Sequence, residues 1–149
     1  LNAPVTVTGT TGNINLLTKT IPQGLFAPTV NSIRKPQHIE GKAFGTINAT
    51  TAGNVQFKFR FDPSSSAGIT LPAGQVAADF VIDFSVVFTA YNRQYLSFRM
   101  SVHNRAALAD VVDETINFSA LSWDLVFQCQ LANPADSVTF KHVHFKTVG

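Results

Sequence analysis

The stretch that decides the fold is NVQFKFRFD, residues 54–62, in which apolar and polar side chains alternate without a break. Successive side chains of a β-strand point to opposite faces, so a period of two gathers the apolar ones on one face. That face carries Val55, Phe57, Phe59 and Phe61. The segment therefore predicts a strand with one face in a hydrophobic core and the other in water.

The same alternation recurs in residues 78–90, 96–102 and 123–131, with weaker versions in residues 14–20, 42–50 and 115–119. In residues 137–147 the apolar side chains change parity between Phe140 and Val143. One extra residue near Lys141 or His142, a β-bulge, would return them to a single face. These patterns together predict about eight strands.

The segments between these patterns carry turn and loop residues. Residues 90–93 and 133–136 read as tight turns, and residues 63–75, rich in Ser, Gly and Pro, predict a long surface loop. Residues 104–114 are the only segment compatible with a helix. The Thr- and Gly-rich residues 1–13 predict a linker or the end of a stalk.

Many short strands with polar connections predict an all-β fold. Eight strands with one long irregular connection favour an antiparallel jelly-roll sandwich, with residues 14–149 forming a single domain. An immunoglobulin-type sandwich is disfavoured, because Cys129 is the only cysteine and the pair that brackets a tryptophan is missing. Leu1 in place of an initiator methionine indicates a processed product or a piece of a longer chain.

Charge is scarce in this sequence. Asp, Glu, Lys and Arg make up 13% of the 149 residues, whereas about 25% is ordinary. Either sister subunits bury part of the surface or neutral polar groups cover it, and the apolar content of 45% favours the first explanation. Val81, Val87 and Val126, on the polar parity of their strands, are the side chains expected to face a neighbour.

The composition also excludes two classes of partner. Arg34 and Lys35 form the only adjacent basic pair, whereas a nucleic-acid-binding surface normally carries a basic stripe or patch. No apolar run approaches the roughly 20 residues of a membrane-spanning helix. We expect neither nucleic-acid binding nor membrane insertion.

Residues with possible chemistry have plainer interpretations. Cys129 shares the apolar parity of its strand, so a buried, inert thiol is expected. His142 and His144 could present two metal ligands on one strand face, but zinc needs at least three from the protein, so a metal-free pair near a sheet edge is favoured. The acidic cluster at residues 110–114 is interpreted as a solvated loop rather than a calcium site. No catalytic signature occurs, and we expect no enzyme activity, cofactor or metal.

The C-terminal third is similar to a known family. Residues 113–119 (DETINFS) lead into the strand at residues 123–130, then a tight turn and residues 136–140 (DSVTF). This succession resembles the closing hairpins of the trimeric jelly-roll head domains at the tips of viral and phage attachment fibres, and residues 20–25 resemble the entry into their first strands. The resemblance implies a homotrimer on the virion surface that binds a host-cell receptor or glycan without chemistry. It assigns no binding residue.

Two other functions fit the same sequence. A viral capsid jelly roll, or a capsid-protrusion domain, would have a structural role. A shell subunit usually carries a basic arm for RNA, and none is present here. A free-standing carbohydrate-binding or tumour-necrosis-factor-like module would bind its ligand outside any virion. An enzyme is the least favoured function.

Recognition is predicted at the turn that carries Tyr91, Asn92 and Arg93. A tight turn at the end of a rigid sandwich presents side chains at little entropic cost, and Tyr and Arg are frequent in binding hot spots. The alternative is structural, with Asn92 supplying turn geometry and Tyr91 capping the end of the core. The loop at residues 63–75 and a cleft between subunits are the other possible sites.

Overall fold

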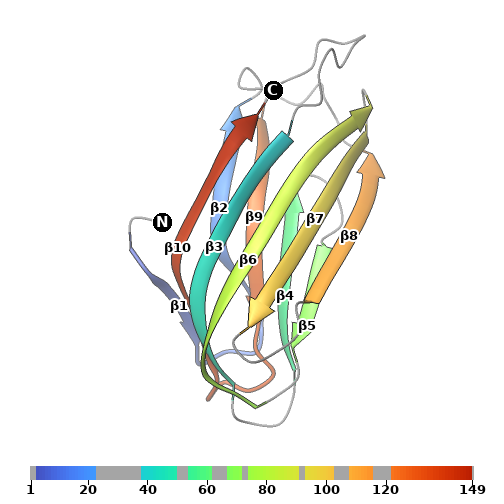
Figure 1. The fold of residues 1–149 in the computed structure, drawn as a ribbon. Helices are drawn as coiled ribbons and strands as arrows, with labels where there is room; N and C mark the ends of the chain where they lie inside the picture. The colour runs from blue at the N-terminus through green and yellow to red at the C-terminus, as the bar shows by residue number, and fades with distance from the viewer. Residues whose placement is uncertain are drawn as a thin grey trace.

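The computed structural model describes residues 3–22, 38–49, 54–61, 67–71, 74–90, 93–102, 108–115 and 122–148. The strands are β1 Val5–Thr8, β2 Asn13–Pro22, β3 His38–Ala49, β4 Val55–Phe61, β5 Ala67–Leu71, β6 Gln75–Ala90, β7 Arg93–Val102, β8 Leu108–Thr115, β9 Ser122–Gln130 and β10 Ser137–Val148. They form a six-stranded sheet in the order β1-β10-β3-β6-β7-β8 and a four-stranded sheet in the order β2-β9-β4-β5. The two sheets lie face to face (Figure 1). These ranges contain no helix that is long and apolar enough to cross a membrane.

The strands pair in a nested order. β1 pairs with β10, β2 with β9, β3 with β6 and β4 with β5, all antiparallel. This nested pairing, with the first four strands alternating between the two sheets, is that of a jelly roll. β7 and β8 extend the six-stranded sheet beyond β6. The predicted fold class, an all-β antiparallel jelly-roll sandwich, is confirmed.

The period-two patterns match the observed burial. β4 alternates between buried and half-buried residues from Val55 to Phe61, as its sequence predicts. β7 alternates between outward-facing and buried residues from Arg93 to Val102. The other strongly patterned segments correspond to β6, β9 and β10. The large apolar-parity side chains that the structure describes in β4, β6, β7 and β9 are buried between the sheets, as the patterning predicts.

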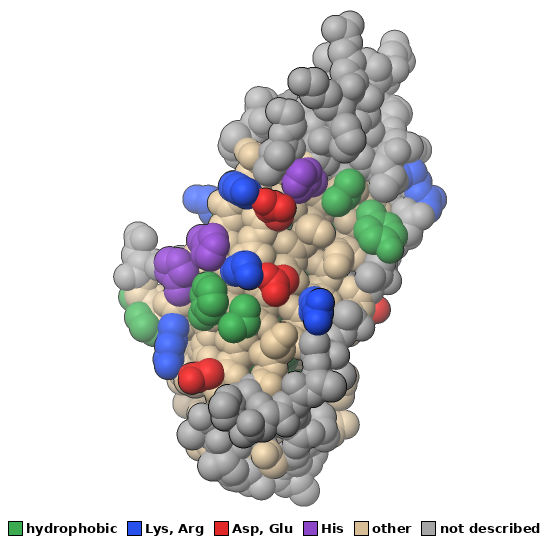
Figure 2. Space-filling model, viewed as in Figure 1, with side chains coloured by type: hydrophobic (Ala, Val, Ile, Leu, Met, Phe, Trp, Pro, Cys, Tyr) green, Lys and Arg blue, Asp and Glu red, His purple; other side chains and the backbone are tan. Residues whose placement is uncertain are grey.

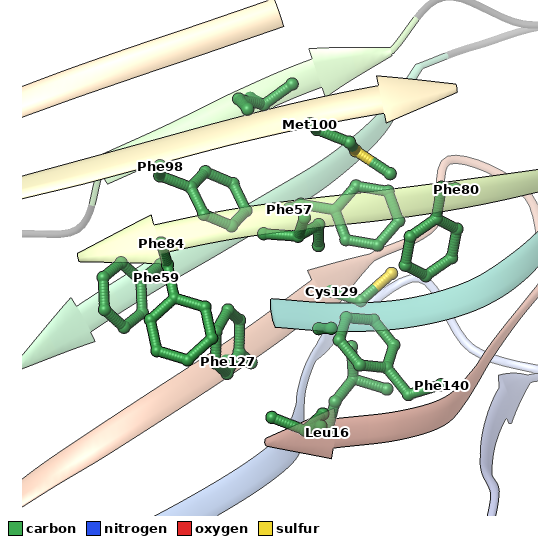
Figure 3. Close-up of a cluster of buried hydrophobic side chains, with 14 of the residues drawn as sticks. Leu16, Phe57, Phe59, Phe80, Phe84, Phe98, Met100, Phe127, Cys129 and Phe140 are labelled. Atoms are coloured by element: carbon green, nitrogen blue, oxygen red, sulfur yellow. The ribbon is translucent and has the colours of Figure 1, made fainter. Parts of the chain in front are cut away.

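The core contains a cluster of phenylalanine rings from both sheets (Figure 3). Five rings lie mid-strand on the apolar parity of the patterned segments and are all buried: Phe57, Phe59, Phe84, Phe98 and Phe127. The Phe59 ring centroid lies 5.0 Å from that of Phe127 and 5.1 Å from that of Phe84. Phe80 and Phe140, with centroids 5.2 Å apart, extend the cluster. Each buried ring contributes about 1.5–3 kcal/mol of hydrophobic free energy.

β10 contains the predicted bulge. Its register with β3 shifts between Phe140 and His142. Phe140 and Val143 are consequently both buried, whereas His142 and His144 are exposed on the outer face of the sheet. The bulge therefore reconciles the two apolar parities and turns two histidines outward.

The described ranges contain ten strands, where about eight were predicted for the chain. β5 lies within the predicted loop at residues 63–75, and β8 overlaps residues 104–114, the predicted helix-compatible segment. Both are edge strands, and pairing with β4 and β7 stabilises a conformation that their own sequences do not favour. The backbone N–H of Gly68 on β5 donates to Oδ2 of Asp110 on β8 at 2.7 Å, which links the two sheet edges.

β1 lies within residues 1–13, the predicted linker or stalk end. It pairs with β10 from Val5 to Thr8. Val7 is buried, and the hydroxyl oxygens of Thr6 and Thr139 are 2.9 Å apart. Residues 5–8 are thus part of the sandwich. A stalk next to it stays a prediction.

Candidate binding site

The residues predicted for recognition are only partly covered by the described ranges. Tyr91 and Asn92 lie outside them, and Arg93 is the first residue of β7. Arg93 is exposed on the outer face of the six-stranded sheet, and every second residue of β7 shares that face. Among these is Tyr95, 42% exposed, the one large apolar side chain that the described part of the chain leaves exposed.

A groove of about 540 Å³ crosses this outer face over β10, β3, β6 and β7. Gly41, Phe84 and Phe145 lie along its floor. The residues directly before and after each of them in sequence point outward and form its walls. A side chain at Gly41 would collide with the Phe84 ring and with the backbone oxygen of His144. Glycine at this position therefore lets the three strands under the groove approach closely.

Two cross-strand rows of polar side chains line the groove. In register, the first row is His144, Lys42, Asp83 and Arg99, and the second row is Lys146, Glu40, Ser85 and Ser97. Neighbouring strands lie about 4.8 Å apart, so each row of four side chains spans about 14 Å. Backbone hydrogen bonds of four strands fix the register, and with it the spacing of these side chains.

Ion pairs engage most of the charges in the two rows. Nζ of Lys42 lies 3.0 Å from Oδ1 of Asp83, and Nζ of Lys146 lies 2.8 Å from Oε1 of Glu40. The Lys146 ammonium, through its hydrogen bond and its charge, holds the pKa of Glu40 below its ordinary value. His38, 3.5 Å from the same carboxylate, acts in the same direction. The Glu40 carboxylate is therefore an acceptor at neutral pH.

Arg99 differs from the two lysines. It stands opposite Asp83 in register, but the Asp83 carboxylate is engaged by Lys42 on its other side. Arg99 is exposed and makes no ion pair or hydrogen bond within the described part of the chain. The groove lining thus holds three fixed cations against two carboxylates, and the unmatched cation lies at the β7 end.

An aromatic cluster borders the groove at the β10 end. Phe44 on β3 has its ring centroid 6.1 Å from that of His144, with the planes 23° apart, and 6.3 Å from that of His142. The two imidazole centroids are 5.5 Å apart. Figure 2 shows this face, with charged, histidine and apolar side chains gathered together over the six-stranded sheet. Ring faces and charged rows therefore meet at His144.

The other sequence candidates have structural roles or no partners for chemistry. Cys129 is buried, as predicted, and burial raises the pKa of its thiol to about 12, which keeps the thiol protonated at neutral pH. His142 and His144 share a face, but the described residues contain no group of three or more potential metal ligands. The acidic cluster at residues 110–114 lies on β8, so its interpretation as a loop was wrong.

The structure also bears on the three valines expected to face a neighbouring subunit. Val126 is 1% exposed within the single chain, so the prediction was wrong for this residue. Val81 and Val87 are half-buried on the outer face of the six-stranded sheet.

On the outer face of the four-stranded sheet, Nε2 of Gln128 donates to Oδ1 of Asn15 at 2.7 Å. These amides share that face with Lys58 and Arg60, so neutral polar groups cover part of it.

Sequence reasoning did not find the groove. Its polar residues come from four strands that are far apart in the sequence, and only the strand order brings them together. The available signal was weak: a charged residue at the outward parity of β3, β6, β7 and β10. That signal is shared by any solvated sheet face.

Comparisons with known proteins give a weak likeness of fold. No protein-family model matches the sequence, and no curated protein matches it. The chain is similar to the CBM2 module of the evolved Dit of Lactobacillus casei BL23 phage J-1, with 11% identity and a TM-score of 0.43, over 86% of this chain and 66% of that one. It thus spans just under two thirds of that module.

Two further solved structures show the range of the likeness. A seed lectin of Lotus tetragonolobus has 8% identity and a TM-score of 0.45 over 99% of this chain and 94% of that one. The alginate lyase of Klebsiella pneumoniae has 9% identity and a TM-score of 0.40 over 88% and 69%. At these values the similarities carry no statement about function.

Proposed function

We propose that this chain is a non-catalytic recognition module that binds a glycan in the groove across β10, β3, β6 and β7. The observation that carries the proposal is the arrangement of the two polar rows beside the aromatic cluster. Donors and acceptors stand there at fixed spacing on a rigid sheet, within about 14 Å.

The chemistry of the groove suits a hydroxyl-rich ligand. Sugar hydroxyls donate and accept hydrogen bonds, while the ring faces present C–H groups. The carboxylates of Glu40 and Asp83 accept, lysine and arginine donate, and Ser85 and Ser97 do both. Hydrogen bonds to charged groups are roughly twice as strong as those between neutral groups. The rings of Phe44 and His144 offer flat surfaces for the C–H groups.

The groove is ordered before a ligand arrives. The Lys42–Asp83 and Lys146–Glu40 pairs hold four side chains over the groove. Side chains that are already constrained lose little rotamer freedom on binding, which favours affinity. The strand register provides the same order in the backbone.

Binding without hydrolysis is the favoured activity. Glycoside hydrolysis requires a carboxyl group with a raised pKa that acts as the acid. Lys146 lowers the pKa of Glu40 instead. The neighbouring lysine thus suits this carboxylate to accept hydrogen bonds from a ligand.

The biological setting that we propose is the head of a viral attachment fibre. Its supports are the resemblance of residues 113–140 to such heads and the jelly-roll pairing, which viral capsid and lectin domains share. In this setting the chain is a homotrimer on the virion surface. The turn with Tyr91, Asn92 and Arg93, which leads into β7, then adds contacts to a larger receptor. Light scattering after size exclusion should give three times the monomer mass, and a monomer at every concentration would instead favour a free-standing binding module.

A glycan array tests the proposed binding function. We expect the wild-type chain to bind a subset of glycans and the Ser85→Tyr variant to lose them, because a tyrosine in the second row would fill the groove. Tyrosine is well tolerated on an outward strand position, so the variant should fold. Gln56→Tyr, outward on β4 of the other sheet, is the matched control.

The outcomes are distinct. Loss of binding in Ser85→Tyr but not in Gln56→Tyr supports the groove. Equal binding by both folded variants would place recognition elsewhere. A wild-type chain that binds no glycan would overturn the proposed function.

A further inference from the structure

We propose that the ligand of the groove is an acidic glycan, and that Arg99 binds the carboxylate of one of its sugars. This inference rests on the proposed function and specifies the class of glycan. It follows from the position and the engagement of the charges along the first row.

Arg99 is the groove's available cation. The ammonium groups of Lys42 and Lys146 already contact carboxylates at 3.0 Å and 2.8 Å. Arg99 is exposed and, among the described residues, has neither an ion pair nor a hydrogen bond. A ligand anion at Arg99 therefore displaces no ion pair within the described part of the chain.

The nearest acid does not satisfy Arg99. Asp83 stands directly opposite it between β6 and β7, yet its carboxylate contacts Lys42 on the β3 side. The charge of Asp83 is thus largely compensated, and it repels a ligand carboxylate less than a lone carboxylate would. The Arg99 guanidinium therefore remains a positive charge at the β7 end of the groove, and a neutral sugar would provide no anion to pair with it.

The geometry of the guanidinium selects a carboxylate. Arginine presents a planar fork of N–H donors that matches the two oxygens of a carboxylate, and such bidentate pairs are among the stronger hydrogen-bonded interactions. Ser97 lies two residues earlier on the same face of β7, about 7 Å away, and Ser85 stands opposite Ser97 on β6. Their hydroxyls are placed to bond the hydroxyls of the same sugar ring.

The remaining sugars then extend across the strands. From Arg99 the first row runs over Asp83 and Lys42 to His144, where the Phe44 ring lies. An acidic sugar at the β7 end and a neutral sugar against the rings at the β10 end would use both parts of the groove. The ligand is therefore a short oligosaccharide with its carboxylate at one end.

Calorimetric titration with matched acidic and neutral probes tests this inference. The probes are sialyllactose, lactose and sulfated lactose, together with oligogalacturonate and its carboxyl-reduced form. We expect a carboxylated probe to bind at least about tenfold more tightly than its neutral counterpart, and Arg99→Gln to remove this difference with a loss of about tenfold to a hundredfold. Arg99→Lys should recover only part of it, because lysine lacks the fork.

The control variant is Lys58→Gln, which removes a cation from the outer face of β4 on the other sheet. It should leave the preference for the carboxylate intact. Tighter binding of the sulfated probe than of sialyllactose would overturn the choice of carboxylate. Equal affinity for acidic and neutral probes would overturn the inference while leaving the glycan-binding function standing, whereas a glycan array with no binding at all would remove both.

Discussion

Lys42 and Asp83 face each other across β3 and β6, with Nζ and Oδ1 3.0 Å apart and side chains 53% and 48% exposed. A pair this exposed is screened by water and contributes roughly 0–1 kcal/mol to stability. Its position at the centre of the first row points to ligand binding instead. A substitution in this pair should therefore affect ligand binding more than the free energy of unfolding.

The first prediction concerns Asp83→Asn. We expect the free energy of unfolding, from urea denaturation, to change by less than about 1 kcal/mol. The affinity for a neutral glycan probe such as lactose should fall about tenfold, because a charged acceptor of its hydroxyl groups is replaced by a neutral amide. A loss of stability well above this value would mean that the ion pair holds the sheet together.

The second prediction concerns the core. Phe59→Ala should lower the free energy of unfolding by about 3–5 kcal/mol, because the ring packs against Phe84 and Phe127 inside the sandwich. Lys58→Ala, one residue away on the outer face, should change it by no more than about 0.5 kcal/mol. Urea denaturation followed by tryptophan fluorescence measures both. Similar losses at the two positions would contradict the alternation of β4.

The third prediction uses the pKa of Cys129, which burial raises from 9.0 to about 12. Between these values the unfolded thiol ionises while the folded thiol keeps its proton, so unfolding is increasingly favoured as pH rises. Stability should therefore fall above about pH 9, and by less in Cys129→Ala, when urea midpoints of both proteins are compared at pH 7 and about pH 10. An identical alkaline loss in the two proteins would show that Cys129 is not the responsible group.

Thiol labelling provides an independent check on the same residue. The native chain should react slowly with a disulfide reagent at neutral pH, and the urea-unfolded chain should react rapidly. Rapid labelling of the native chain would place the thiol outside the core.

The fourth prediction separates the turn from the groove. Arg93 and Arg99 share the outer face of β7 but lie six residues, or about 20 Å, apart. A variant with both Tyr91→Ala and Arg93→Ala should bind a short glycan as the wild type does, yet attach less well to susceptible cells. Weaker binding of the short glycan would move the site to the turn, and undiminished attachment to cells would exclude the turn from recognition.

Patterning predicted the core strands because burial of one strand face requires apolar residues at every second position of the sequence. Phe57, Phe59 and Phe127 could be placed from parity alone. The parity change in residues 137–147 predicted a bulge near Lys141 or His142, and the register shifts between Phe140 and His142. β5 and β8 could not be predicted in this way. Edge strands depend on a partner strand, and their local composition favours a loop or a helix equally well.

The groove lay beyond sequence analysis for a related reason. Lys42 and Asp83 are neighbours because β3 pairs with β6, and Arg99 joins them because β7 pairs with β6. Each residue by itself is an ordinary outward-facing charge. A site built across several strands can be recognised only when the strand order and the register are known. A turn such as residues 90–93 is contiguous in the sequence and can be recognised without the structure.

The most direct test of binding in the groove is an NMR titration of the isotopically labelled chain with the glycan that gives the strongest array signal. We expect the largest amide shift changes at residues 40–42, 83–85, 97–99 and 144–146, the four strand segments that line the groove. Residues of β2, β4 and β9, whose outer faces lie on the other sheet, should show little change. Shift changes concentrated on β2, β4 and β9, with none in the four groove segments, would contradict the account.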